Sequence, residues 1–527
     1  MNRIASQKWV KPLLIAVILM VTCGIILIAV LAGQTDNKPT GNDLTIVSTA
    51  ENADYRYHLY SDDTIGIAAY LGSNHIITIP EAIESKTVRR IEDSAFEGSA
   101  LTGIVLPETI HSVGKRAFYG AEMLTSLTIP DSVKTIGKDA FLVQKNGASS
   151  FIPWVYSRNT DFVVVGDGIL IAYIGAAPEK LEIPDDVKHI SRFYFNTTSI
   201  TSLTLPDSLM SIGESAFEDF TKIQSVTFPD KLQEIGARGF YNCQSLTKLT
   251  LPDTTLTIAS EAFACCPKMK TADLPSVATI GNRAFAYCLG LTSVDFSDKK
   301  LTYIGDEAFA ECSLLSEVEI PNSVTHLGLR ALKGTAWMLS QKDKEFVVTS
   351  NGMLVGYNGN GGQVTVEDTS ISVIADAFRE RTDITGIILG NSVTALSPGA
   401  FENCTSLSAF VASKYLKTVG ARAFAGCSAL VQADLLDGVT AIGENTFENC
   451  VSLMSIVLPK NLKVIAENCF AGCETLQNVT LPTALQTVMA NAFGGCPLEK
   501  VIFNGSAKQK KAIQIKEGNA VFSALMS

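Results

Sequence analysis

The sequence predicts a solenoid of stacked coils of about 23 residues, with parallel β-strands and short helical or 3-10 turns. A string of the form Ile/Val-Gly-x-x-Ala-Phe recurs along most of the chain, usually at intervals of 22 to 24 residues. Many copies follow a Leu-x-Leu-Pro stretch, whose alternation is typical of a half-buried strand. One copy is too short to bury its own apolar side chains, so the copies must stack to form a core.

The last residue of the string marks the position of each coil. It falls at Phe96, Phe118, Phe141, Phe195, Phe217, Phe240, Phe263, Phe285, Phe309, Leu332, Phe378, Phe401, Phe424, Phe447, Phe470 and Phe493. Two intervals are longer: 54 residues before Phe195 and 46 before Phe378. We therefore expect one solenoid over residues 55–500, interrupted at two places.

One copy shows how the elements of a coil follow from its residues. Leu203 to Leu205 alternates apolar and polar residues, which predicts a strand. Pro206-Asp207 ends that strand, because proline lacks the N–H for a ladder and aspartate favours turns. Leu209 to Ile212 predicts a second short strand before Gly213, and Ala216-Phe217 places apolar groups inward on a one-turn helix or tight bend.

The full unit, L-T-x-L-x-L-P-x-S-V-x-x-I-G-x-x-A-F-x-x-C, resembles that of the BspA-like leucine-rich-repeat surface proteins. The copies from Phe240 to Pro252 and from Phe447 to Leu453 are most similar to it. The resemblance implies a leucine-rich-repeat solenoid with an opening unit that starts near Tyr55 and a C-terminal cap over residues 501–527. It also implies adhesion or partner binding, without fixing the partner.

Two segments, 151–175 and 337–358, break the regular pattern and are similar to each other. Each pairs two β-type runs around a glycine-containing turn, from Trp154 to Tyr173 and from Trp337 to Tyr357, which predicts hairpins. We interpret them as decorations of a coil; the alternative is a projecting element that shapes a ligand surface.

The N-terminus predicts export from the cytoplasm. Arg3, Lys8 and Lys11 precede an apolar run from Pro12 to Ala32, whose helical length of about 31 Å would span a bilayer core. This charge asymmetry is typical of a signal-anchor or a cleaved signal peptide over residues 1–33, and the two remain open. Residues 34–54 are polar and aperiodic, so we expect an extracytoplasmic linker.

Cysteines follow the repeat and not a disulfide pattern. Nine lie three residues after the repeat Phe: Cys243, Cys266, Cys288, Cys312, Cys404, Cys427, Cys450, Cys473 and Cys496. Parallel Cβ vectors in one column keep sulfurs from the approach that a disulfide needs, which favours buried free thiols. Disulfides and a metal site are the less favoured alternatives.

Composition excludes several classes of function. The net charge of −11 argues against nucleic acid, because binding to phosphates requires clustered Lys and Arg. The chain has only five His, all in unrelated coils, and no Gly-rich phosphate loop, Gly-x-Ser-x-Gly or His-Glu-x-x-His motif. We therefore predict no enzyme and no cofactor.

The middle residue of each Leu-x-Leu strand should point to solvent. Coil by coil, this residue gives a candidate ligand face of Thr204, Thr227, Thr250, Asp273, Asp295, Glu319, Ile388, Val411 and Val457, with Glu317 alongside. The face begins with hydroxyls, continues with carboxylates and ends with apolar groups.

Each part of this face suggests a different contact. The threonines offer hydrogen bonds to glycans. Stacked carboxylates repel each other unless they are screened, so the acidic part is interpreted as a solvated face, with a weak calcium or basic-partner site as the alternative. The apolar residues suggest a docking patch.

Together these features predict a cell-surface protein that binds extracellular protein or glycan ligands in adhesion and contacts the membrane through its N-terminal segment. The alternative is an envelope-anchored scaffold that organises the cell's own surface components.

Overall fold

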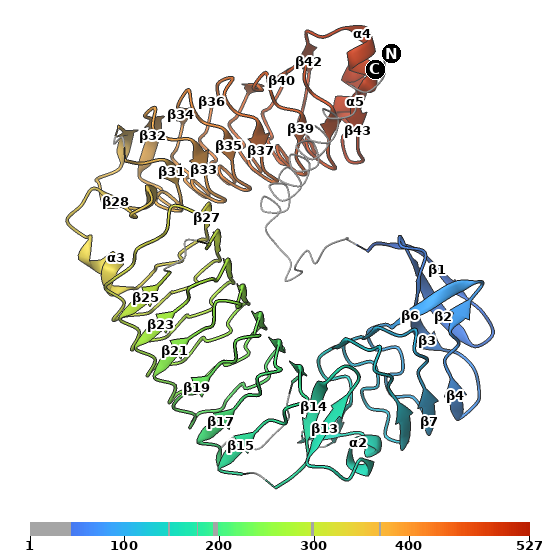
Figure 1. Cartoon of the computed structure of the whole chain (residues 1–527). Helices are drawn as coiled ribbons and strands as arrows, with labels where there is room; N and C mark the ends of the chain where they lie inside the picture. Colours follow the sequence, from blue (N-terminus) through green and yellow to red (C-terminus); the bar gives the residue numbers. More distant parts are fainter. Residues whose placement is uncertain (1–43, 146–147, 177, 193–198, 297–299, 368–369) are drawn as a thin grey trace, which may run out of the picture. The chain divides into compact units, whose positions relative to one another are not determined.

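The computed structural model describes residues 44–527 except 146–147, 177, 193–198, 297–299 and 368–369. These residues form two compact units. The N-terminal unit comprises the described residues up to His326 together with Arg330–Leu339, and the C-terminal unit comprises Leu327–Leu329 and Ser340–Ser527. Each unit is a stack of coils with parallel strands (Figure 1), which confirms the predicted solenoid architecture.

Each regular coil contributes two strands, which we call the leading and the trailing strand. In the N-terminal unit the leading strands are β4 (Ile76–Thr78), β7 (Gly103–Val105), β9 (Ser126–Thr128), β15 (Lys180–Glu182), β17 (Ser202–Thr204), β19 (Val226–Thr227), β21 (Lys248–Thr250), β23 (Thr271–Asp273) and β25 (Ser293–Asp295). The trailing strands are β6 (Lys86–Ile91), β8 (Ser112–Val113), β10 (Thr135–Ile136), β16 (His189–Ile190), β18 (Ser211–Ile212), β20 (Glu234–Ile235), β22 (Thr257–Ile258), β24 (Thr279–Ile280), β26 (Tyr303–Ile304) and β27 (His326–Leu327). A short strand β5 (Ala82–Ile83) pairs antiparallel with β6.

The C-terminal unit repeats this arrangement. Its leading strands are β30 (Gly362–Val366), β32 (Ile384–Leu389), β34 (Ala409–Val411), β36 (Gln432–Asp434), β38 (Ser455–Val457), β40 (Asn478–Leu481) and β42 (Lys500–Phe503). Its trailing strands are β31 (Val373–Ile374), β33 (Ala395–Leu396), β35 (Thr418–Val419), β37 (Ala441–Ile442), β39 (Val464–Ile465), β41 (Thr487–Val488) and β43 (Gln514–Ile515). Figure 1 shows the two sets of strands on opposite edges of the coils.

Three hairpins each begin a sheet of trailing strands. They are β2 (Tyr55–Tyr60) with β3 (Ile65–Tyr70), β13 (Phe162–Val165) with β14 (Ile169–Tyr173), and β28 (Phe346–Val348) with β29 (Met353–Tyr357). The second strand of each hairpin pairs in parallel with the next trailing strand, β6, β16 or β31. Segments 151–175 and 337–358 thus contain the hairpins that the sequence predicts, and one strand of each hairpin belongs to a ladder of trailing strands.

Short helices precede the second and third hairpins. Helix α2 (Pro153–Ser157) follows a small hairpin of β11 (Leu142–Lys145) and β12 (Ala148–Phe151), and α3 (Ala336–Ser340) precedes β28. Both helices are fixed in the same way to an earlier coil. The backbone N–H of Trp154 donates to the carbonyl of Leu124 at 3.0 Å, and that of Trp337 to Leu315 at 2.7 Å.

The repeat phenylalanines form continuous stacks in the core. Rings in adjacent coils lie 5.0–5.6 Å apart between centroids from Phe217 to Phe309, and 5.2–5.3 Å apart from Phe378 to Phe493. All of these side chains are buried. The predicted marker residues therefore form the core wherever the structure describes them; Phe195 lies outside the described residues.

The bend around each repeat phenylalanine is a hydrogen-bonded turn, so of the two forms that the sequence left open the tight bend is correct and the one-turn helix is not. Left-handed residues lie two positions before and two after the ring, for example Arg238 (φ 56°) and Asn242 (φ 58°) around Phe240. A residue with positive φ cannot continue a right-handed helix, so the chain turns sharply at both points.

The cysteines three residues after these phenylalanines form the predicted buried column. Each thiol donates to the carbonyl of the repeat Phe in the preceding coil, as Cys450 does to Phe424 at 3.1 Å. Burial raises the pKa of Cys404 and Cys450 to about 12. All eleven cysteines that the structure describes have free thiols, and among them only Cys265 is partly exposed.

Both ends of the described chain carry additional elements. At the C-terminus, α4 (Ala507–Ala512) and α5 (Ala520–Met526) flank β43, and Phe522 continues the stack on Phe493 at 4.7 Å. At the other end, β1 (Ile46–Glu51) pairs antiparallel with β2. The linker prediction for residues 34–54 is thus wrong over this strand, whose β-branched residues favour pairing over a flexible coil.

The predicted signal-anchor, residues 1–33, lies outside the described residues. Within the part of the chain that the structure describes, no helix combines the length and the apolar composition that crossing a membrane requires.

Candidate functional site

The outward residues of the leading strands lie in register within separate sheets. Thr204 pairs with Thr227, and Thr250, Asp273 and Asp295 are successive partners in the sheet β21-β23-β25. In the C-terminal unit, Ile388 pairs with Val411, whereas Val457 belongs to the sheet β38-β40-β42. The predicted face therefore consists of several short ladders and is not one continuous sheet.

The hydroxyl part of the face carries free donors. Thr204, Thr227 and Thr250 are exposed, and no described residue bonds to their hydroxyls. The threonines immediately before two of these strands do have partners. The hydroxyls of Thr201 and Thr247 donate to the carbonyls of Glu179 and Gln224 in the preceding coil. One threonine column thus holds the coils together while its neighbour faces solvent unpaired.

The acidic part places like charges side by side. Asp273 and Asp295 are direct partners in parallel strands, and Glu317 forms a bridge with Ser293. Asp295, Glu317 and Glu319 are exposed, so water screens them, and Asp273 is half-buried. Among the described residues, no group of three or more His, Cys, Asp or Glu side chains is arranged to hold a metal ion.

The apolar part is less uniform than the sequence predicts. Val457 is 70% exposed and Val411 is 39% exposed, but Ile388 is half-buried. Val431 and Met454, one position before β36 and β38, are also exposed and widen the patch. The alternation rule missed these two because they precede the strands.

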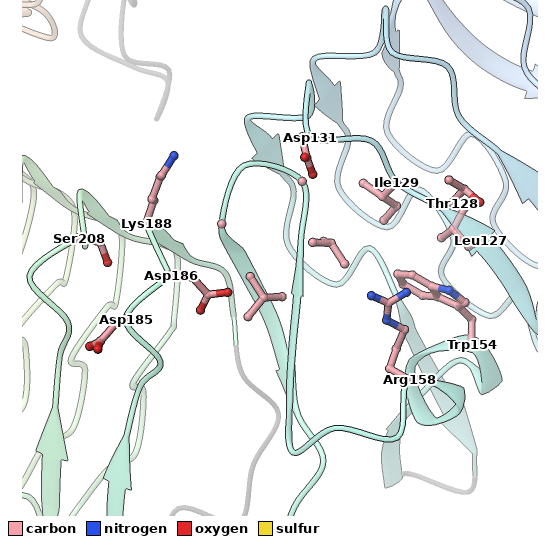
Figure 2. A pocket seen from close by; sticks show the side chains of 14 residues that line it. Leu127, Thr128, Ile129, Asp131, Trp154, Arg158, Asp185, Asp186, Lys188 and Ser208 are labelled. Carbon is pink, nitrogen blue, oxygen red and sulfur yellow. The ribbon is translucent and has the colours of Figure 1, made fainter.

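A cavity of about 570 Å³ lies in the N-terminal unit at the hairpin β13-β14. Its lining comes from five places in the sequence: the strand β9, helix α2, the hairpin, the coil of β15 and the coil of β17 (Figure 2). Trp154 and Val165 contribute apolar surface, while Arg158, Asp131 and Asp186 contribute charge. Trp154 is only 3% exposed, so it forms part of the wall and offers no open platform for stacking a sugar.

The turn of this hairpin is bonded to the coils on both sides. The carboxylate of Asp167 accepts from Lys134 Nζ at 2.8 Å and from Lys188 Nζ at 2.6 Å. Hydrogen bonds from these two ammonium groups lower the pKa of Asp167 to about 2. The hairpin therefore forms a rigid wall of the cavity.

The family model for the BspA type leucine rich repeat region matches residues 65–154, 172–288, 233–347, 356–435 and 394–514. The chain belongs to this family. The two internal stretches of this BspA-type chain that the family model does not match, 155–171 and 348–355, fall on the second and third hairpins.

Several solved structures are similar to this BspA-type protein. A leucine-rich repeat protein from Bacteroides ovatus is 24% identical, with 91% of this chain and 99% of that chain covered and a TM-score of 0.28. A leucine rich cell surface protein from Faecalibacterium prausnitzii is 20% identical, with coverage of 89% and 97% and a TM-score of 0.29. The pneumococcal vaccine antigen PcpA is 16% identical, with coverage of 69% and 99% and a TM-score of 0.28. None of the curated proteins matches the chain.

Proposed function

We propose that this BspA-type protein is displayed at the cell surface, held through its N-terminal segment, and binds extracellular protein or glycan ligands in adhesion. The proposal is supported by the family and by the outward ladders of the leading strands.

The observation that carries the proposal is the column of unpaired hydroxyls at Thr204, Thr227 and Thr250. Each hydroxyl both donates and accepts, which suits the alternating hydroxyl groups of a glycan or the backbone of a protein. Successive strands lie about 4.8 Å apart, so adjacent hydroxyls are spaced for one extended ligand. Several weak contacts along these successive strands then add to a useful affinity.

A pair of substitutions in one coil tests this face. Thr227→Arg places a bulky charge on the leading strand β19, and Gln233→Arg places the same charge just before the trailing strand β20. Both positions are exposed, so neither change should disturb the core. We expect Thr227→Arg to reduce binding of the full chain to mucin-coated or matrix-coated surfaces by about tenfold, with Gln233→Arg unchanged.

Equal binding by both variants would remove the leading-strand face as the site. Retention on the producing cell's own envelope proteins, with no binding to mucin or matrix, would support the envelope scaffold instead of adhesion.

A further inference from the structure

The leading strands of the N-terminal unit are interrupted at the hairpin β13-β14. The leading strand β9 ends the sheet β4-β7-β9, and the next leading strand, β15, begins a separate sheet. On the side of the trailing strands, the turn of the hairpin adds one layer of backbone between the coils of β10 and β16. The N–H of Asp167 donates to the carbonyl of Val133, and the N–H of Lys188 donates to that of Gly168, so the turn of the hairpin lies between two coils. Within the described residues, the coil that contributes β14 therefore has no leading strand.

Two backbone groups that flank β9 have no partner among the described residues. In the preceding coils of the same sheet, the N–H of Ile79 donates to Val105 and that of Leu106 donates to Thr128. The equivalent N–H of Ile129 finds no acceptor among the described residues. The carbonyl of Thr125 likewise receives no bond from the described part of the chain, whereas the equivalent carbonyl of Thr102 accepts from the next coil. One edge of β9 is thus open for strand addition.

The cavity lies against this open edge. Leu127, Thr128 and Ile129 lie on one side of it (Figure 2), and Val164 and Val165 of the hairpin also belong to its lining. Its volume of about 570 Å³ is within the range of peptide and small-ligand sites, roughly 300–1,000 Å³. An extended segment has the hydrogen-bonding groups that the edge lacks, and its side chains would contact these valines.

The charges at the cavity favour a basic segment. Asp131, Asp185 and Asp186 are exposed, and within the described structure none of them forms an ion pair. Of the two cations in the lining, Lys188 is already bonded to Asp167, which leaves Arg158 as the cation without an acidic partner in the described chain. Asp167 is shared by two lysines, so together with its ion pairs the site holds four carboxylates and three cations. This excess of negative charge favours a cationic partner.

We propose that the open edge of β9 binds an extended basic peptide segment of a partner protein, which adds as a strand beside β9. This site is distinct from the threonine ladder, so the two proposals can fail independently. The proposal also assigns a role to the hairpin. The hairpin adds a strand to the trailing side of the stack and none to the leading side, so one edge of β9 is exposed.

The test uses the full chain and a labelled probe peptide of alternating valine and lysine. Fluorescence anisotropy should show saturable binding. It should be lost when alternate backbone nitrogens of the peptide are methylated, because N-methylation removes donors without changing charge. A valine-glutamate peptide should bind at least about tenfold more weakly. Bound peptide should also slow hydrogen exchange at the amide of Ile129.

The variant Asp131→Asn/Asp186→Asn should weaken binding of the valine-lysine peptide by about tenfold. Asp253→Asn, an exposed carboxylate elsewhere in the same unit, should leave it unchanged. Equal binding of the methylated peptide, or of the glutamate peptide, would overturn the proposal. Protection of the Ile129 amide in the free chain would also overturn it, because the edge would then be covered by this chain or by a second copy.

Discussion

The hairpins β13-β14 and β28-β29 have the same backbone arrangement, but different side-chain interactions stabilise their turns. Both follow a short helix with a tryptophan, and both begin a parallel ladder of trailing strands. Both also turn through a left-handed glycine, Gly168 with φ 71° and Gly352 with φ 83°. The shared backbone shows that these two ladders of trailing strands each start with an antiparallel hairpin.

The difference lies in how each turn is held. The first turn uses the charge of Asp167, which binds lysines from the coils on both sides. The second turn has neutral side-chain bonds: the hydroxyl of Thr349 donates to Asn351 Oδ1 at 2.6 Å and accepts from the N–H of Met353 at 3.1 Å, and the hydroxyl of Ser372 in the next coil donates to the carbonyl of Gly352 at 3.3 Å. The conserved element is therefore the backbone geometry, and the side chains that secure it can be ionic or neutral.

The largest expected effect concerns the two tryptophans. Trp154 is buried and packs on Phe141 at 5.4 Å between ring centroids, whereas Trp337 is half-buried. We expect Trp154→Ala to lower the free energy of unfolding by about 3–5 kcal/mol, because it leaves a large cavity at the end of a ring stack. Trp337→Ala should cost clearly less, and urea denaturation of the full chain measures both.

Trp154→Phe is the matched control, since it keeps an aromatic ring beside Phe141. It should recover most of the lost stability. Similar losses for Trp154→Ala and Trp337→Ala would contradict the claim that burial distinguishes these two sites.

The ring stack was predictable from the sequence, but the role of the hairpins was not. A fixed period places Phe240 and Phe263 at equivalent positions, and stacking follows because one coil cannot bury its own ring. Sequence similarity between the two irregular segments predicts hairpins, yet it does not show that Ile169 and Leu170 pair with a strand some twenty residues later. Pairing of that kind depends on the stack as a whole.

The left-handed turns and the cavity escaped prediction for different reasons. Residues as unlike as Arg238 and Glu261 adopt positive φ before the ring, so residue type gives no signal there. The cavity is lined by residues as far apart in sequence as Leu127 and Ser208, so it exists only in the folded stack of coils. Alternation did identify Thr204 and Thr227 as outward residues, because it depends only on local geometry.

A smaller effect should come from the two turn glycines. A Cβ added at Gly168 would lie 2.6 Å from the carbonyl oxygen of Asp186, and one at Gly352 would lie 2.5 Å from that of Ser370. Each Gly→Ala change combines this clash with the strain of positive φ, so we expect each to cost about 2–3 kcal/mol in urea denaturation.

Gly362→Ala separates the two contributions. Gly362 has φ 73°, but a Cβ there would meet nothing within 4 Å, so only the backbone strain of about 1 kcal/mol should appear. Equal costs at all three positions would show that close packing of the hairpin turns against the next coil contributes nothing.

The smallest expected effect is the pH dependence at the first turn. The pKa of Asp167 is lowered from 3.8 to about 2, so its contribution to stability is present above pH 4 and disappears as the pH falls through 2. Asp167→Asn should lower the free energy of unfolding by about 1 kcal/mol at pH 7, because the side chain is partly exposed and solvent screens the pairs.

The same change should remove part of the acid sensitivity, so the curves of the parent and of Asp167→Asn should converge as the pH approaches 2. Asp131→Asn is the control, since Asp131 is exposed and forms no ion pair with the described residues. If Asp167→Asn leaves stability at pH 7 unchanged, the two lysines do not secure the turn, and the first hairpin depends on its glycines and backbone bonds in the same way as the second.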